Sequence, residues 1–131
     1  MSDFNGDGKL DIAFCNQSQI GIMLGNGDGT FQSPVFYTAD STSQGLFTFA
    51  IGDINSDGKP DLLVAEYSNF NSPQFVAFLG NGDGTFQAQQ TVSVAQTPLA
   101  EEGIVVGDFN SDGLLDFIFQ TGGGMDVFIQ Q

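Results

Sequence analysis

The 131-residue sequence predicts an all-β fold, and three features of the chain lead to it. An acidic loop occurs three times, a glycine-rich turn occurs twice, and short apolar runs lie between them. The runs are about four to eight residues long and rich in Val, Ile, Phe and Leu, which is typical of strands and too short for globular helices. We expect strands within residues 10–15, 20–24, 34–38, 46–53, 61–66, 74–80, 90–95, 103–108, 115–120 and 125–131.

The acidic loop and the turn recur at a regular distance. The loop copies "DFNGDGKLD", "DINSDGKPD" and "DFNSDGLLD" begin at Asp3, Asp53 and Asp108, with offsets of 50 and 55 residues. The turn "LGNGDGTFQ" begins at Leu24 and again at Leu79. A period of about 50 residues with turn signals at fixed places indicates a propeller or a solenoid. Four antiparallel strands per period predict β-propeller blades.

We expect one domain over residues 1–131, with about two and a half blades. The blades are predicted at about 1–45, 46–99 and 100–131, and contain three, four and three strands. Closed propellers have about four to eight blades, so this length is too short for a ring. We therefore expect an incomplete propeller: either an excised fragment of a longer one or a fragment that completes an oligomeric ring by self-association.

Charge and composition exclude several function classes. The formal net charge is -14, from sixteen acidic and two basic residues, so nucleic acids and anionic membrane surfaces would be repelled while cations would be attracted. Hydrophobic residues make up 40% of the chain and include fourteen Phe, which is enough to build a core. No apolar run is long enough for a membrane-spanning helix, and the start of the chain lacks the pattern of a signal peptide.

The residues used for catalysis are scarce, so we expect no enzyme. The chain has no His and a single Cys, and Cys15 is expected to be a small side chain packed on a strand. We expect Glu66 in a surface loop, with contact to a ligand as the alternative. The adjacent pair Glu101 and Glu102 is expected in a solvated loop and is poorly placed for shared acid/base work, because adjacent strand residues point to opposite faces.

All three acidic loops follow the pattern D-x-N-x-D-G-x-x-D, which suits a hard cation. Oxygens at positions one, three and five can face a common centre, glycine at six permits a sharp reversal, and position seven offers its carbonyl. Aspartate at nine would close a cage of oxygens, which favours Ca²⁺ over zinc, copper or magnesium. An EF-hand is excluded because position twelve is not Glu and a strand follows. The alternative is three turns that bind no ion.

The glycine-rich turns are interpreted as hairpins. Asn26-Gly27 and Asn81-Gly82 supply residues that tolerate positive φ. An additional cation site at these turns is the alternative.

The motifs "GDINSDGKPDLLVA" at 52–65, "GDFNSDGLLDFIF" at 107–119 and the two "LGNGDGTFQ" turns resemble the FG-GAP-like, or VCBS, repeat family of β-propellers, which is related to the blades of integrin α subunits. The residues "FG-GAP" themselves are absent, so the chain is more similar to bacterial VCBS-type blades. The resemblance implies a calcium loop between the first two strands of each blade, with up to three Ca²⁺ ions. The ligands it implies are Asp3, Asn5, Asp7, the Lys9 carbonyl and Asp11; Asp53, Asn55, Asp57, the Lys59 carbonyl and Asp61; and Asp108, Asn110, Asp112, the Leu114 carbonyl and Asp116.

The resemblance also implies a function and a location. Its members are mostly secreted or on the cell surface, which implies an extracellular or cell-surface module. We expect a calcium-binding structural or adhesive scaffold for protein or surface interactions. The alternative is a glycan-binding, lectin-like module or a non-catalytic accessory domain of a secreted enzyme. Tyr37 and Tyr67 are expected to pack in the fold rather than to form a sugar platform. The expected partners are further copies of the chain and a protein or glycan ligand, without nucleic acid or membrane insertion.

Overall fold

The computed structural model describes residues 1–16, 18–38, 43–68, 72–92, 100–121 and 124–130. Each of the ten expected strands is present in this part of the chain. The strands are β1 (Ile12–Cys15), β2 (Gln19–Met23), β3 (Val35–Thr38), β4 (Ser43–Gly52), β5 (Asp61–Ser68), β6 (Ser72–Phe78), β7 (Gln90–Val92), β8 (Ala100–Gly107), β9 (Asp116–Thr121) and β10 (Gly124–Phe128). Helices long and apolar enough to cross a membrane are absent from these residues.

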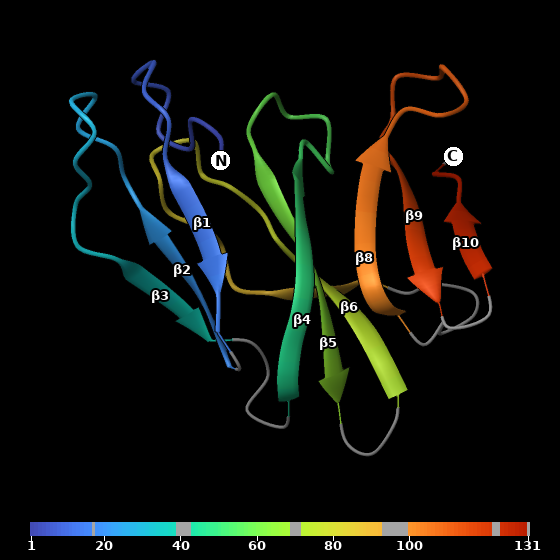
Figure 1. Ribbon diagram of the computed structural model, residues 1–131. Helices are drawn as coiled ribbons and strands as arrows, with labels where there is room; N and C mark the ends of the chain where they lie inside the picture. The colour runs from blue at the N-terminus through green and yellow to red at the C-terminus, as the bar shows by residue number, and fades with distance from the viewer. Residues whose placement is uncertain (17, 39–42, 69–71, 93–99, 122–123, 131) are drawn as a thin grey trace.

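The strands form three antiparallel sheets, in the orders β1-β2-β3, β4-β5-β6-β7 and β10-β9-β8. We call them the first, middle and third sheets. They stand side by side, and the three acidic loops emerge at the same end of the molecule (Figure 1). The prediction of partial propeller blades with three, four and three strands is therefore confirmed. The predicted boundary at residues 45 and 46 falls within β4, and the division into blades stays a prediction.

The middle sheet is buried on both faces because its strands alternate between two neighbours. Leu62 and Val64 belong to a core cluster shared with Ile20 and Ile22 of the first sheet. Leu63, on the opposite face, packs in a second cluster with residues of the third sheet. Each strand directs successive side chains to opposite faces, so a continuous apolar run such as "LLVA" is what a strand between two sheets requires.

The second cluster contains a close aromatic contact. Phe75 of the middle sheet and Phe119 of the third sheet have ring centroids 3.9 Å apart, and both side chains are fully buried. Phe75, Phe117 and Phe119 thus fill much of the space between these two sheets.

Three acidic residues lie differently from expectation, while Cys15 lies as expected. Glu66 is fully buried within β5, not in a surface loop, because β5 continues to Ser68 with β4 and β6 paired on either side. Glu101 and Glu102 belong to β8 rather than to a loop. Cys15 is a free, half-buried cysteine on β1 that packs against the first core cluster.

Candidate functional site

The first aspartate of each acidic loop is the centre of a hydrogen-bond network. In the first loop, Asp3 Oδ1 accepts hydrogen bonds from the backbone N–H groups of Gly6 (2.8 Å) and Asp7 (3.2 Å). Its Oδ2 accepts one from Gly8 N–H at 2.8 Å. The carboxylates of Asp53 and Asp108 accept the equivalent bonds from Asp57 and Gly58, and from Asp112 and Gly113. A carboxylate that accepts hydrogen bonds from several backbone amides holds the surrounding residues in a tight loop.

The third and fifth positions extend this network in small steps. Asn5 Oδ1 accepts a hydrogen bond from Asp7 N–H at 3.1 Å, and Asp7 Oδ1 accepts one from Lys9 N–H at 3.0 Å. The second and third loops contain the same pair of bonds, through Asn55, Asp57 and Lys59 and through Asn110, Asp112 and Leu114. Three different sequences therefore fold into one loop geometry.

The sharp reversal of each loop needs two residues with positive φ. The glycines at position six have φ between 81° and 87°. Position four is also left-handed, with φ of 72° at Gly6, 60° at Ser56 and 64° at Ser111. A non-glycine residue in this region is strained, so the loop network must hold both serines in place.

The ninth aspartate of each loop connects the loop to the end of a strand or to a turn. Asp61 is fully buried, and its Oδ2 accepts a hydrogen bond from Ile54 N–H at 2.9 Å while Oδ1 accepts one from Gly80 N–H at 2.7 Å. Asp11 makes the equivalent bonds to Phe4 and Gly25, and Asp116 to Phe109 and Gln130. Charge-assisted bonds from two amides offset part of the desolvation of each carboxylate.

A lysine at position seven offsets one of the three aspartate charges in each of the first two loops but not in the third. Lys9 Nζ lies 3.2 Å from Asp7 Oδ2, and Lys59 Nζ lies 3.7 Å from Asp57 Oδ2. The hydrogen bond from Lys9 N–H lowers the pKa of Asp7, and the Lys9 ammonium adds to the effect. The third loop has Leu114 in place of lysine, so its side chains carry one more net negative charge.

The structure places the predicted ligands in two groups. The residues at positions one, three and five share the loop network, whereas the ninth aspartates are buried at its base. Within the described ranges, no three His, Cys, Asp or Glu side chains already form a group that could hold a metal ion. The predicted ligand sets therefore stay a prediction. Their chemistry fits a hard cation, because the donors are all oxygens and a carboxylate oxygen that accepts a single amide bond, such as Asp3 Oδ2, keeps a second lone pair.

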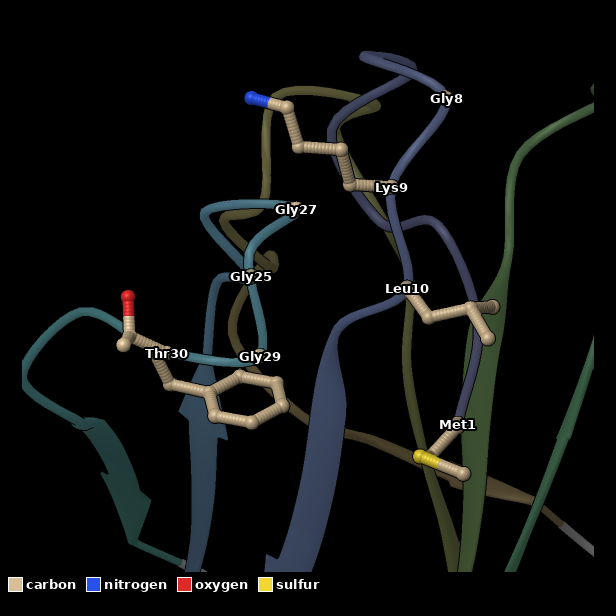
Figure 2. Close-up of a pocket in the computed structure, with 9 residues that line it drawn as sticks. Met1, Gly8, Lys9, Leu10, Gly25, Gly27, Gly29 and Thr30 are labelled. Atoms are coloured by element: carbon tan, nitrogen blue, oxygen red, sulfur yellow. The ribbon is translucent and has the colours of Figure 1, made fainter.

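The glycine-rich turns are hairpins, as predicted. Asp28 Oδ1 accepts hydrogen bonds from the hydroxyl (2.6 Å) and the N–H (2.9 Å) of Thr30, and these bonds lower the pKa of Asp28. Asp83 and Thr85 repeat this arrangement. The side chain of Lys9 extends over Gly27, where a Cβ would come within 2.9 Å of it (Figure 2). The first turn and the first acidic loop thus pack together.

The middle hairpin also holds the first acidic loop. Gly84 N–H donates a hydrogen bond to the Phe4 carbonyl at 2.9 Å. Phe86 packs edge-on against Phe4 and Tyr37, and its N–H donates to Tyr37 Oη at 3.2 Å. Sequence reasoning missed this contact, although a phenylalanine repeated after each turn was the available signal. Tyr37 packs as expected, while the side chain of Tyr67 lies outside the described part.

Comparison with known proteins identifies the repeat. A family model for the FG-GAP-like repeat matches residues 3–64 and, a second time, residues 53–119. The chain belongs to the FG-GAP-like repeat family. Each match runs from one acidic loop to the strand that follows the next. FG-GAP-like repeats are generally non-catalytic modules and often bind Ca²⁺. Comparisons with curated proteins and with solved structures gave no significant match.

Proposed function

We propose that this FG-GAP-like module binds calcium in its three acidic loops and that the ions stabilise the repeats. The observation that carries the proposal is the loop network, which is the same in three different sequences. In each loop the backbone amides already hold the carboxylates at positions one and five. The loop is therefore ordered by its own backbone bonds and does not need the ion to order the chain.

The ligand oxygens would come from the side chains at positions one, three, five and nine and from the carbonyl at seven. Carboxylates about 4 Å apart repel each other by several kcal/mol per pair at low effective dielectric. A divalent cation bound between them makes the net electrostatic energy of the site favourable. In the first two loops the lysine ammonium is a weaker, singly charged substitute. Its ion pair is exposed and screened by solvent, so a divalent ion can replace it.

Calcium at these sites would act on stability rather than on chemistry. Extracellular calcium modules bind with Kd of about 10⁻⁴ to 10⁻³ M, and at about 1 mM calcium each such site adds roughly 0.4–1.4 kcal/mol. Sites of this affinity would fill only where calcium is abundant, so the calcium proposal carries with it the proposal of an extracellular or cell-surface location. The close packing of neighbouring sheets through the two core clusters supports a scaffolding or adhesive role.

The experiment compares thermal unfolding of the chain in calcium, in magnesium and in a chelator. We expect calcium to raise the midpoint and magnesium to raise it less. The variant Asp53→Asn removes a candidate ligand and should reduce the calcium response, whereas Asp126→Asn removes an exposed charge on β10 and should leave it intact. A midpoint that does not respond to calcium in the unsubstituted chain would refute the proposal.

The glycan-binding alternative lacks a specific supporting observation in the described residues. Among the side chains that the structure describes, the exposed aromatic ones are Phe31 and Phe36 near the first sheet and Phe109 near the third. They are divided between the two ends of the stack instead of forming one platform.

A further inference from the structure

The exposed large apolar side chains of the described residues gather on the two end sheets and their loops. The middle sheet contributes none of them within its described residues. The first repeat contributes Met1, Leu10, Phe31, Val35 and Phe36, and the third contributes Val105, Phe109, Met125, Val127 and Ile129. Apolar surface gathered in two places on a small, highly charged protein indicates binding surfaces.

The interface between the first and middle sheets and the interface between the middle and third sheets are oriented in the same direction along the chain. We call the face that packs on the following sheet the leading face; it carries Leu63 and Phe75 in the middle sheet and Ile20 in the first. The opposite, trailing face packs on the preceding sheet and carries Leu62 in the middle sheet and Phe119 in the third. In both interfaces a leading face meets a trailing face.

The third sheet therefore ends the stack with a leading face. Its residues Met125 and Val127 are 73% and 54% exposed. By the repeat, they are equivalent to Phe75 and Ala77, which are 0% and 4% exposed in the middle sheet. Strand pairing supports the equivalence. Ala77 pairs with Leu63 in the middle sheet, and Val127 pairs with Ile118, the residue equivalent to Leu63, in the third sheet. Positions buried in one sheet are thus open in the next.

The first sheet begins the stack with a trailing face. Phe14 and Phe36 pack edge-on against each other there, at a centroid distance of 6.0 Å, and Phe36 is 47% exposed. Phe14 is equivalent to Val64, which is fully buried in the middle sheet against the first. The two free faces are therefore of opposite kinds.

The loop ends of the two outer repeats also carry matching halves of a contact. Inside the chain, a Cβ on Gly84 would lie 2.8 Å from Leu24, and Phe86 covers Phe4. The equivalents of Gly84 and Phe86 are Gly29, which has open space around it, and Phe31. Both line a groove of about 420 Å³ together with Met1, Lys9 and Leu10 (Figure 2).

The third repeat carries the other half of that contact. Phe109 is equivalent to Phe4, and Ile129 is equivalent to Leu24, because Gln130 bonds Asp116 as Gly25 bonds Asp11. Phe109 is 48% exposed and Ile129 is 44% exposed. Phe109 and Ile129 are therefore the apolar side chains that the turn at Gly29 and Phe31 of another copy would cover.

We propose that a second copy of this chain occupies these surfaces head to tail. The leading face of one copy's third sheet packs on the trailing face of the other copy's first sheet, and Phe109 and Ile129 enter the groove over Gly29 and Phe31. Because the paired faces differ, the contact is heterologous and each added copy presents a new free face. Phe109 and Lys9 belong to the acidic loops, so the assembly is measured both in calcium and in a chelator. Each copy carries a formal charge of -14, so salt should strengthen the assembly by screening.

Light scattering of the 131-residue chain over a range of concentrations, in low and high salt, measures the assembly. We expect a mass above 13.9 kDa that grows with concentration and with salt. The double variant Met125→Glu and Val127→Glu should stay at the monomer mass. The matched control, Gln87→Glu and Gln90→Glu, adds the same charge at exposed sites of the middle repeat and should assemble like the unsubstituted chain. A chain that remains monomeric at every concentration overturns the proposal and leaves these faces to a different partner.

Cross-linking tests the polarity of the contact. The Cβ of a residue at position 84 would lie 3.5 Å from Asn5 Cβ, which is within disulfide range. In a Cys15→Ser background, Asn5→Cys with Gly84→Cys should therefore close within one chain as the positive control. Across two copies the equivalent pair is Gly29→Cys on one chain and Asn110→Cys on another.

We expect a disulfide-linked dimer only when the two single-cysteine chains are mixed. A dimer formed by Asn110→Cys alone would indicate like faces in contact and would overturn the head-to-tail arrangement. Circular dichroism of each variant shows whether it is folded. The calcium response of the unsubstituted chain is recorded separately, so failure of the contact and failure of calcium binding give different results.

Discussion

The middle and third repeats have similar acidic loops but very different sheet surfaces. Asp61 and Asp116 are both fully buried, and each accepts two backbone amide bonds at nearly equal distances. Phe75 and Met125 are also equivalent, yet the first is fully buried and the second is 73% exposed. The comparison shows that bonds within a repeat fix the loop, whereas the surroundings of a sheet residue depend on whether another sheet lies against it.

The largest difference is expected for the sheet faces. Phe75→Ala should lower the free energy of unfolding by about 3–5 kcal/mol, because it leaves a cavity beside Phe119. Met125→Ala, at the equivalent exposed site, should change it by less than about 0.5 kcal/mol when the chain is monomeric. Urea unfolding of dilute protein measures both values. Equal losses would mean that the two faces have the same surroundings after all.

Substitution of the ninth aspartate should lower the free energy of unfolding by a similar amount in the second and third loops, unlike the substitutions on the sheet faces. Asp61→Asn and Asp116→Asn each leave one buried amide without its carboxylate acceptor, so each should cost about 1–3 kcal/mol. Asp126→Asn is the exposed control and should cost little. Urea unfolding in a chelator separates this effect from any bound ion. A much smaller loss for Asp116→Asn would show that the Gln130 bond does not hold its loop as firmly as the Gly80 bond holds the second.

The seventh position sharpens the comparison through charge. If the loops bind calcium, Leu114→Lys should weaken the third site and Lys59→Leu should strengthen the second. An exposed ion pair is worth about 0.2–1 kcal/mol, which corresponds to at most about a fivefold change in Kd. Isothermal titration with Ca²⁺ measures the change for each variant. Shifts in the opposite direction would show that the lysine ammonium does not compete with the cation.

The smallest effect concerns the hairpin of the middle repeat. Thr85→Val removes the hydroxyl that donates to Asp83, so the lowered pKa of Asp83 should rise toward its ordinary value. A lowered pKa contributes stability above the pKa of the unfolded chain, and that contribution is lost as the pH falls through the folded value. The variant should therefore lose less stability in acid. An NMR titration of Asp83, with Asp28 as the internal reference, should show a shift at Asp83 alone.

Local patterns were enough to predict the strands and the loops. The strands followed from short apolar runs between turn signals, and the hairpins from the two "NGDG" motifs, whose glycines have φ of 80–89°. The loop pattern placed oxygens at positions one, three and five in one network. Its ninth aspartate was predicted only as a ligand, and its bonds to Gly25, Gly80 and Gln130 were not predicted. Those partners lie fourteen or nineteen residues away, beyond the reach of the loop pattern.

Glu66 shows the same division between local and distant information. The position of Glu66 at the end of an apolar run predicts a surface residue. The strand β5 nevertheless continues past Glu66, because β4 and β6 pair with it on both sides.

The sequence by itself determined the repeat, the turns, the strands and the geometry of the acidic loops. These features depend on residues within about ten positions of each other, where glycine conformation and side-chain-to-backbone bonds decide the outcome. Only the tertiary structure decided which face of each sheet is buried, how Phe86 and Gly84 cover the first loop, and which apolar surfaces remain open. Those outcomes depend on contacts between repeats some fifty residues apart, and burial is a property of the neighbours as much as of the residue.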